Sequence, residues 1–158
     1  MDRRIAVLWE RVETLRQLAA RSPSPRPVIA AFVAAGSHLT ALHRRGTVHG
    51  AFSPDHAMIT VNGEVHLCDH RRHDRAAVRC AAPEVRLGQV PTPASDQYSL
   101  AAALIEAMVA TPVHHAWPAH ARRALVRALS VDAAARWPAV SDLTAALTAS
   151  GRWRRLLW

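Results

Sequence analysis

The sequence contains no lysine. All 20 of its basic residues are arginine, against 12 acidic residues. Reactions that depend on a lysine amine are therefore excluded, including Schiff-base chemistry and the phosphate-binding loop that ends in Gly-Lys-Ser/Thr. The formal net charge of +8 would suit an acidic partner such as a nucleic acid. Because the chain is also rich in Ala, Pro and Val, we interpret the arginine excess mainly as a coding bias.

Cysteines and long apolar runs are also scarce. Cys68 and Cys80 are too few for a disulfide framework, so we expect a reducing, cytoplasmic location. No apolar run approaches the roughly 20 residues needed to span a bilayer, and the first residues lack the apolar segment of a secretory signal. With 158 residues, half of them hydrophobic, we expect one domain over residues 1–150 and a basic aromatic tail over 151–158.

The apolar pattern predicts a mainly helical domain with a small sheet. Helices are expected over residues 5–18, 28–45, 95–110, 119–130 and 139–149, where apolar residues recur at helical spacing or a proline suits the first turn. Short strands are expected at 47–49, 57–61 and 64–68. Asn62-Gly63 predicts a two-residue hairpin turn between the last two strands. The polar, arginine-rich segment 69–81 is expected to be a loop.

Five short motifs occur in the order found in the second half of a protein kinase domain. They are the catalytic-loop region Leu42–His56, Asp69-His70-Arg71 in place of Asp-Phe-Gly, the intact Ala82-Pro83-Glu84, the buried-helix start Ser95–Leu100 and the late arginine site Ala134–Pro138. The chain resembles the C-terminal lobe of a serine/threonine protein kinase over about residues 5–149. The resemblance implies a mainly α, kinase C-lobe-like fold with a small β-hairpin sheet. It also implies that the N-terminal lobe, with its lysine, is absent.

The residues that carry phosphoryl transfer in that family are replaced here. By resemblance, Ala51 stands at the catalytic aspartate, Ser53 at a lysine of many serine/threonine kinases, and His56 at the metal-binding asparagine. Asp69 is what remains of the metal-binding pair. A methyl group cannot accept a proton, and imidazole is a poor ligand for Mg²⁺. The resemblance therefore implies an inactive pseudokinase with no catalytic residue, no bound metal and no cofactor.

The resemblance also implies that residues holding the lobe together are retained. Glu84 and Arg136 should form a buried ion pair, and Asp96 should accept hydrogen bonds from backbone near His49. A protein that keeps the residues that hold its fold together but lacks those that transfer phosphate is expected to act as a protein-binding scaffold or an allosteric regulator.

A protein partner or a second copy of the chain is expected to cover the upper face of the lobe. In a complete kinase that face packs against the other lobe and the nucleotide. Here it would leave an apolar patch exposed, unless Ala51, Phe52, Met58 and Cys68 repack and close the surface.

Two alternatives stay open. A partner chain could complete a split phosphotransferase, with Asp69 binding the metal. An arginine-rich module, centred on residues 71–79, could bind nucleic acid, although we do not expect a nucleic-acid partner.

His66, Cys68 and His70 are of the types that bind zinc, but their spacing matches no standard zinc site. A hydrolase triad is not expected, because the sequence has no Gly-x-Ser-x-Gly turn.

Overall fold

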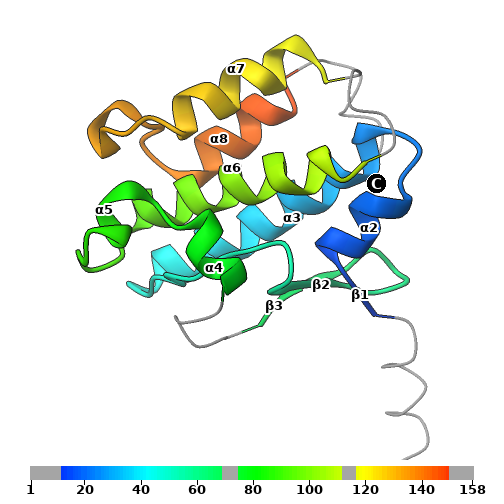
Figure 1. Ribbon diagram of the computed structural model, residues 1–158, viewed down its shortest axis with the longest axis horizontal. Coiled ribbons are helices and arrows are strands. Elements are labelled where there is room, and N and C mark those ends of the chain that lie inside the picture. Colours follow the sequence, from blue (N-terminus) through cyan, green and yellow to red (C-terminus); the bar gives the residue numbers. More distant parts are fainter. Residues whose placement is uncertain (1–11, 69–74, 112–116, 150–158) are drawn as a thin grey trace, which may run out of the picture.

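The computed structural model describes residues 12–68, 75–111 and 117–149. Helices dominate this part of the chain, and a small antiparallel sheet lies on one side (Figure 1). The helices are α2 Leu15–Arg21, α3 Pro25–Arg44, α4 Arg75–Cys80, α5 Pro83–Arg86, α6 Pro93–Val109, α7 Ala119–Ala128 and α8 Val140–Leu147, with a 3₁₀ turn at Ala133–Ala135. The strands are β1 Glu13–Thr14, β2 Ala57–Ile59 and β3 Val65–Leu67, in the order β1-β2-β3. The predicted mainly helical fold class is confirmed.

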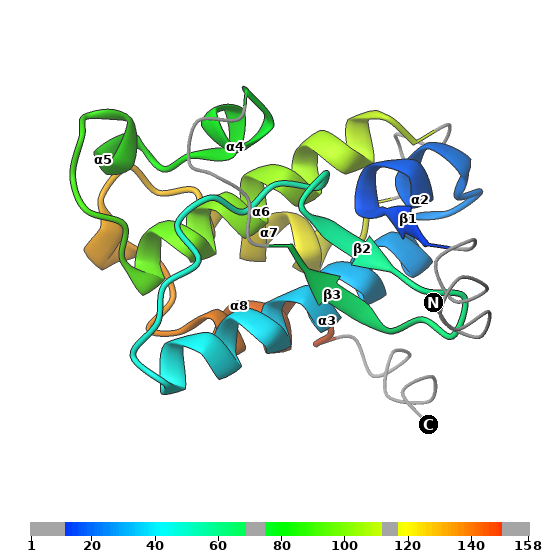
Figure 2. The same cartoon turned by 90° about the horizontal axis from the view of Figure 1, so that it is seen from below.

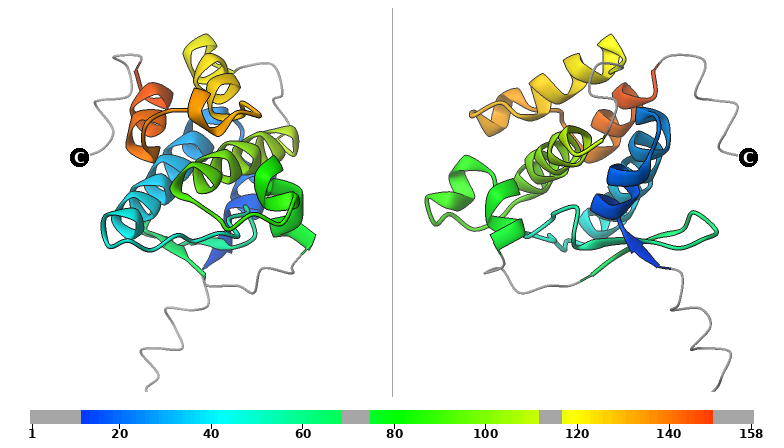
Figure 3. Two further views of the ribbon diagram at one scale, coloured as in Figure 1. Left: turned by 90° about the vertical axis from the view of Figure 1, so that its left-hand side faces the viewer. Right: turned by 45° about the vertical axis from the view of Figure 1, so that its right-hand side comes forward.

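The long helix α3 forms the centre of the molecule. It begins at Pro25, whose fixed φ and missing N–H suit the first turn of a helix. It packs against both α6 and α8. Figures 1 and 3 show the sheet on one side of α3 and α6, and α7 with α8 on the other. The fully buried core includes Phe32, Leu39, Phe52, Leu100, Leu104, Leu143 and Leu147.

The first predicted helix, over residues 5–18, is confirmed from Leu15 onward and wrong at Glu13 and Thr14. Residues 1–11 lie outside the described part of the chain, but Glu13 and Thr14 form a strand that pairs with β2. The helix α2 begins only after them because Thr14 is extended and its hydroxyl accepts a hydrogen bond from the backbone N–H of Gln17. Leu15 and Leu18, two members of the predicted apolar stripe, are buried on α2.

The hairpin between β2 and β3 is confirmed, but its predicted turn is wrong. Ile59 pairs with Val65, and the N–H of Gly63 donates to the carbonyl of Thr60. The N–H of Thr60 also donates to the carbonyl of Glu64, so the loop between these two residues has three residues, 61–63. Gly63 takes the left-handed conformation (φ +81°) that such loops place at their last position.

The strand predicted at 47–49 is also wrong, because its N–H groups bind elsewhere. The N–H of Thr47 donates to the carbonyl of Leu42 at the end of α3, and that of His49 donates to a carboxylate of α6.

The predicted loop 69–81 is wrong over α4, where Ala77 and Cys80 are buried. Residues 69–74 lie outside the described part.

The four remaining helices are confirmed, with ends at most three residues from those predicted. The helix predicted over 95–110 begins at Pro93, behind the N-cap Thr92, whose side chain and Ser95 form a capping box. Within the described ranges, no helix is both long and apolar enough to cross a membrane.

Candidate functional site

The loop between α3 and β2 is the segment that resembles a kinase catalytic loop. Its backbone is anchored on Asp96, which lies in the first turn of α6 and is 1% exposed. The N–H groups of His49 and Gly50 donate to the two carboxylate oxygens at 2.9 and 2.7 Å. The Nε2 atom of His43, from α3, lies 2.8 Å from the same carboxylate. One buried carboxylate therefore holds the loop against two helices.

The residue held at the centre of this loop is Ala51. Its side chain is 5% exposed, and its carbonyl accepts a contact from Nδ1 of His56 at 3.0 Å. The next side chain, Phe52, is fully buried and packs edge-on against Phe32 and His49. The loop is thus firmly packed, but it presents a methyl group where an acid or base would be needed for proton transfer.

The other two loop residues singled out by sequence are buried as well. Ser53 is 0% exposed, and its hydroxyl has no hydrogen-bond partner among the described residues. His56 is 2% exposed, and its backbone carbonyl accepts the N–H of Cys68 at the end of the hairpin. This donor set does not suit Mg²⁺, which prefers hard oxygen ligands in octahedral geometry. Asp69, the expected remnant of the metal pair, lies outside the described residues.

The expected apolar upper face is largely closed by the chain itself. Ala51 and Phe52 are buried, while Met58 and Cys68 are half-buried. The alternative that these four side chains close the surface therefore holds for Ala51 and Phe52, while Met58 and Cys68 stay partly exposed. Phe52 is drawn inward because Phe32 and His49 offer it aromatic partners.

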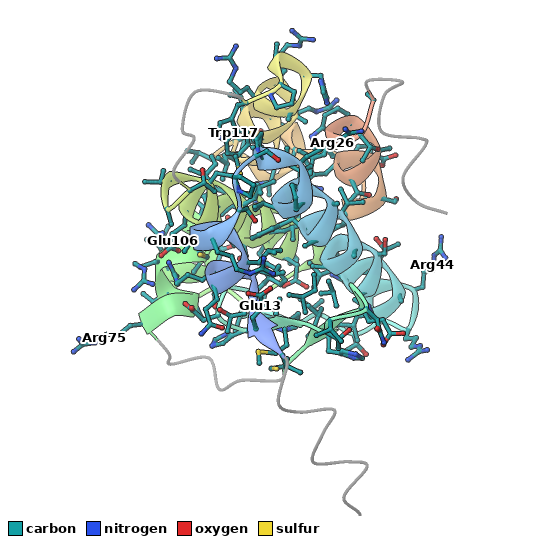
Figure 4. The ribbon with its side chains drawn as sticks, turned by 90° about the vertical axis from the view of Figure 1, so that its right-hand side faces the viewer. Glu13, Arg26, Arg44, Arg75, Glu106 and Trp117 are labelled. Atoms are coloured by element: carbon teal, nitrogen blue, oxygen red, sulfur yellow. The ribbon has the colours of Figure 1, made fainter. Side chains whose placement is uncertain are left out.

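A second anchor joins the loop to α2 and α6. The guanidinium of Arg16 contacts both oxygens of Asp55, at 2.7 and 2.8 Å, and also Glu106 at 2.9 Å. Glu106 accepts a further hydrogen bond from Arg79 and one from the thiol of Cys80. Figure 4 shows Glu106 on the side of the molecule where α2, α4 and α6 meet.

This cluster alters the acidity of its members. Burial raises the pKa of the Cys80 thiol to about 12, and the hydrogen bond to Glu106 adds to the effect. Burial also tends to raise the pKa of Glu106, but the hydrogen bonds from Arg16 and Cys80 outweigh it, so that pKa is lowered. The sequence does not predict this cluster. Its members are far apart in the chain, with Arg16 and Glu106 separated by 90 positions, and no motif connects them.

The ion pair expected between α5 and the segment after α7 is present in the structure. The Nη1 and Nη2 atoms of Arg136 lie 2.7 and 2.8 Å from the two Glu84 carboxylate oxygens. The Arg136 side chain is fully buried and also donates to the carbonyls of Ser130 and Ala94. The hydrogen bonds from Arg136 lower the pKa of Glu84 against the opposing effect of burial.

The two cysteines and the histidines form no further site within the described ranges. Cys68 and Cys80 are free thiols. No group of three His, Cys, Asp or Glu side chains there could hold a metal ion. The predicted basic loop 71–74 and the aromatic tail 151–158 lie outside the described residues.

Comparison with solved structures gives matches over most of this chain. The crystal structure of the Mycobacterium tuberculosis PknI kinase domain carrying two substitutions matches with a TM-score of 0.73 and 23% sequence identity. The match covers 87% of this chain and 61% of that one. A second crystal structure of the PknI kinase domain matches with a TM-score of 0.71 and 22% identity, covering 87% of this chain and 62% of that one.

The fold is that of part of a protein kinase domain. The predicted kinase-like architecture is thereby confirmed, and the chain spans less than two thirds of the length of these kinase domains. No protein-family model and no curated protein matches the sequence. At this level of identity the likeness concerns the fold alone, because one fold can serve many functions.

Proposed function

We propose that this kinase-like chain is a pseudokinase that works by binding another protein, without transferring phosphate. The observation that carries the proposal is the loop anchored on Asp96. Its backbone is fixed by hydrogen bonds to that carboxylate, yet the central side chain is Ala51. Phosphoryl transfer needs a carboxylate to orient the attacking hydroxyl and oxygen ligands to hold Mg²⁺. A methyl group at Ala51 and an imidazole at His56 supply neither.

The ion pair between Glu84 and Arg136 supports a role that depends on a stable shape. A fully buried arginine with a bidentate carboxylate partner and carbonyl acceptors ties α5 to the start of α6 and to the segment after α7. Such a pair favours one defined arrangement of these elements, which a binding surface requires.

Exposed aliphatic side chains support a protein partner. Leu87 and Val90, in the connection between α5 and α6, are 82% and 79% exposed. Val78 on α4 and Val109 on α6 are also more than half exposed. Of these, Val78 lines one pocket together with Ala102 and Ile105 of α6, and apolar side chains that gather in this way commonly mark protein-binding sites. The proposed roles are scaffolding or allosteric control of the bound partner.

A phosphate-transfer assay tests the loss of catalysis. The purified chain is incubated with γ-labelled ATP, Mg²⁺ and a general protein substrate, beside a heat-inactivated sample. We expect no transfer above that control. Transfer above it would refute the proposal, and its loss in Asp69→Ala would then favour the split phosphotransferase. Nucleotide binding is followed in parallel as a thermal shift with ATP and Mg²⁺, and we expect none.

Solution mass and affinity capture test the binding half of the proposal. The expected result is a stable complex in the native host, in which one protein repeatedly co-purifies with the tagged chain, or a homodimer by light scattering. A strictly monomeric chain that captures no protein would contradict it. Binding to nucleic acid that falls steeply with added salt would instead favour the arginine-rich module.

A further inference from the structure

A cavity of about 480 Å³ lies between the last turns of α3, the segment 47–49 and β3. Figure 2 shows β3 running beside α3 on the sheet face of the molecule. The half-buried side chains of Leu42, Val48 and Leu67 provide its apolar walls. Its size falls within the usual range for ligand-binding cavities, roughly 300–1,000 Å³.

The rim of this cavity is basic. The exposed side chains of His38, Arg45 and His66 line it from two different elements, and no aspartate or glutamate is among the lining residues. Two acidic residues contact residues of this lining. Asp96 accepts the N–H of His49, and the exposed Glu64 lies 3.9 Å from His66 without being a lining residue itself. The cavity therefore combines an apolar interior with hydrogen-bond donors that suit an anion.

We propose that this cavity receives an acidic segment of a protein partner, in which an aliphatic side chain lies between glutamates or aspartates. The aliphatic side chain would fill the space against Leu42, Val48 and Leu67. The flanking carboxylates would reach the guanidinium of Arg45 and the histidines of the rim. A free inorganic anion would leave the apolar walls unfilled, and the cavity is large for it. This inference rests on the proposed protein-binding function and names the chemistry of the partner.

A labelled peptide tests the proposal directly. The probe is fluorescein-Glu-Leu-Glu-Glu-Leu-Glu-amide, and its binding to the full chain is followed by fluorescence anisotropy. We expect saturable binding with a Kd below about 1 mM. Arg45→Ala should weaken it by about tenfold, the factor expected for one charge-assisted hydrogen bond. The same peptide with glutamine in place of every glutamate should not bind.

Arg44→Ala is the matched control. Arg44 lies one position away, is exposed, and is not among the lining residues. Figure 4 shows its side chain extending away from the body of the molecule. Because both arginines are exposed, neither substitution should disturb folding. Equal weakening by both variants would mean general charge attraction and would overturn the proposal. His66→Asn should also weaken binding, whereas Glu64→Gln, which removes a carboxylate that competes for His66, should not weaken it.

Three other results would also overturn it. They are the absence of saturable peptide binding, equal binding of the glutamine peptide, and full displacement by inorganic phosphate at about the peptide's own Kd, which would indicate a simple anion site. These failures are distinct from a failure of the proposed function, which would show as phosphate transfer or as a monomeric chain that captures no protein. A chain that transfers phosphate could still bind the peptide, and an inactive chain could fail to bind it.

Discussion

The side chain of Arg136 connects three parts of this molecule. Its guanidinium is fully buried and binds a carboxylate of α5 together with carbonyls at the start of α6 and after α7. It also lies 5.0 Å from the ring centre of Tyr98, within the range of a cation–π contact. Removing one partner of such a buried pair leaves the other charge without compensation, which is far more costly than replacing both.

Arg136→Met should therefore lower the free energy of unfolding by roughly 3–5 kcal/mol. Urea denaturation followed by circular dichroism measures it. The double variant Glu84→Leu/Arg136→Met should recover part of that loss because no buried charge then stands alone. Arg123→Ala, an exposed arginine on α7, is the control and should change little. A loss below about 1 kcal/mol in Arg136→Met would show that the pair does not hold these elements together.

Asp96 stabilises the loop between α3 and β2 by accepting its backbone hydrogen bonds. It accepts the N–H groups of His49 and Gly50, and Gly50 has a positive φ of +75°, which an L side chain rarely adopts. Asp96→Ala should leave both N–H groups without their acceptor, so their exchange with deuterium should quicken by about tenfold or more.

Hydrogen exchange followed by NMR or mass spectrometry checks this. Asp142→Ala is the control, since Asp142 is an exposed carboxylate that accepts only at the start of α8. It should leave the exchange of His49 and Gly50 unchanged. Unaltered exchange of both groups in Asp96→Ala would mean that the loop keeps its shape without the carboxylate.

Among the elements, α3 and α8 lie in tight contact at Gly36. A Cβ atom at Gly36 would lie 2.4 Å from Cγ2 of Thr144 and 3.2 Å from Cδ2 of Leu100. Glycine is thus present on α3 to let another helix approach, in a helix where alanine would otherwise be preferred by about 1 kcal/mol.

Gly36→Ala should destabilise the protein by about 1–3 kcal/mol, because overpacking outweighs the gain in helix propensity. Thr144→Ser removes the Cγ2 methyl and keeps the hydroxyl that donates to Ser141. Combined with Gly36→Ala, Thr144→Ser should restore most of the free energy of unfolding that the alanine removes. Thermal unfolding of the two single variants and the double variant measures this coupling. Simple additivity of the two effects would show that the helices are not in tight contact here.

At the scale of the whole molecule, paired carboxylates make stability depend on pH. The pKa values of Glu84 and Glu106 are both lowered from their ordinary value of 4.5 in the folded protein. A lowered folded-state pKa contributes stability that is fully present above the unfolded value. That stability is lost as the pH falls through the folded value.

The free energy of unfolding should therefore be level near neutral pH and fall steadily below about pH 4.5. Urea titrations across this range measure it. Glu84→Gln should be less stable near neutral pH and should lose less on acidification than the unsubstituted chain. An identical pH profile for the two proteins would show that the carboxylate of Glu84 does not contribute.

Much of this protein was accessible from its sequence because the signals are local. Apolar spacing over Pro25–Arg44 and the capping residues before α6 define those helices by contacts within a few turns. The kinase-like order of motifs indicated the fold, and the same motifs pointed to Glu84, Arg136 and Asp96. The replacement of an acid by Ala51 is likewise visible in the sequence itself.

Tertiary structure alone decided the features that join distant parts of the chain. Glu13 and Thr14 form a strand because they pair with Ile59 and Met58 of β2, far along the chain, a choice that local helix propensity cannot foresee. Phe52 is buried because Phe32 and His49 surround it, and the Arg16 cluster joins residues on three helices and a loop. The basic cavity has the same origin. Its rim comes from a helix and a strand whose side chains are too far apart in the sequence for any periodicity to connect them.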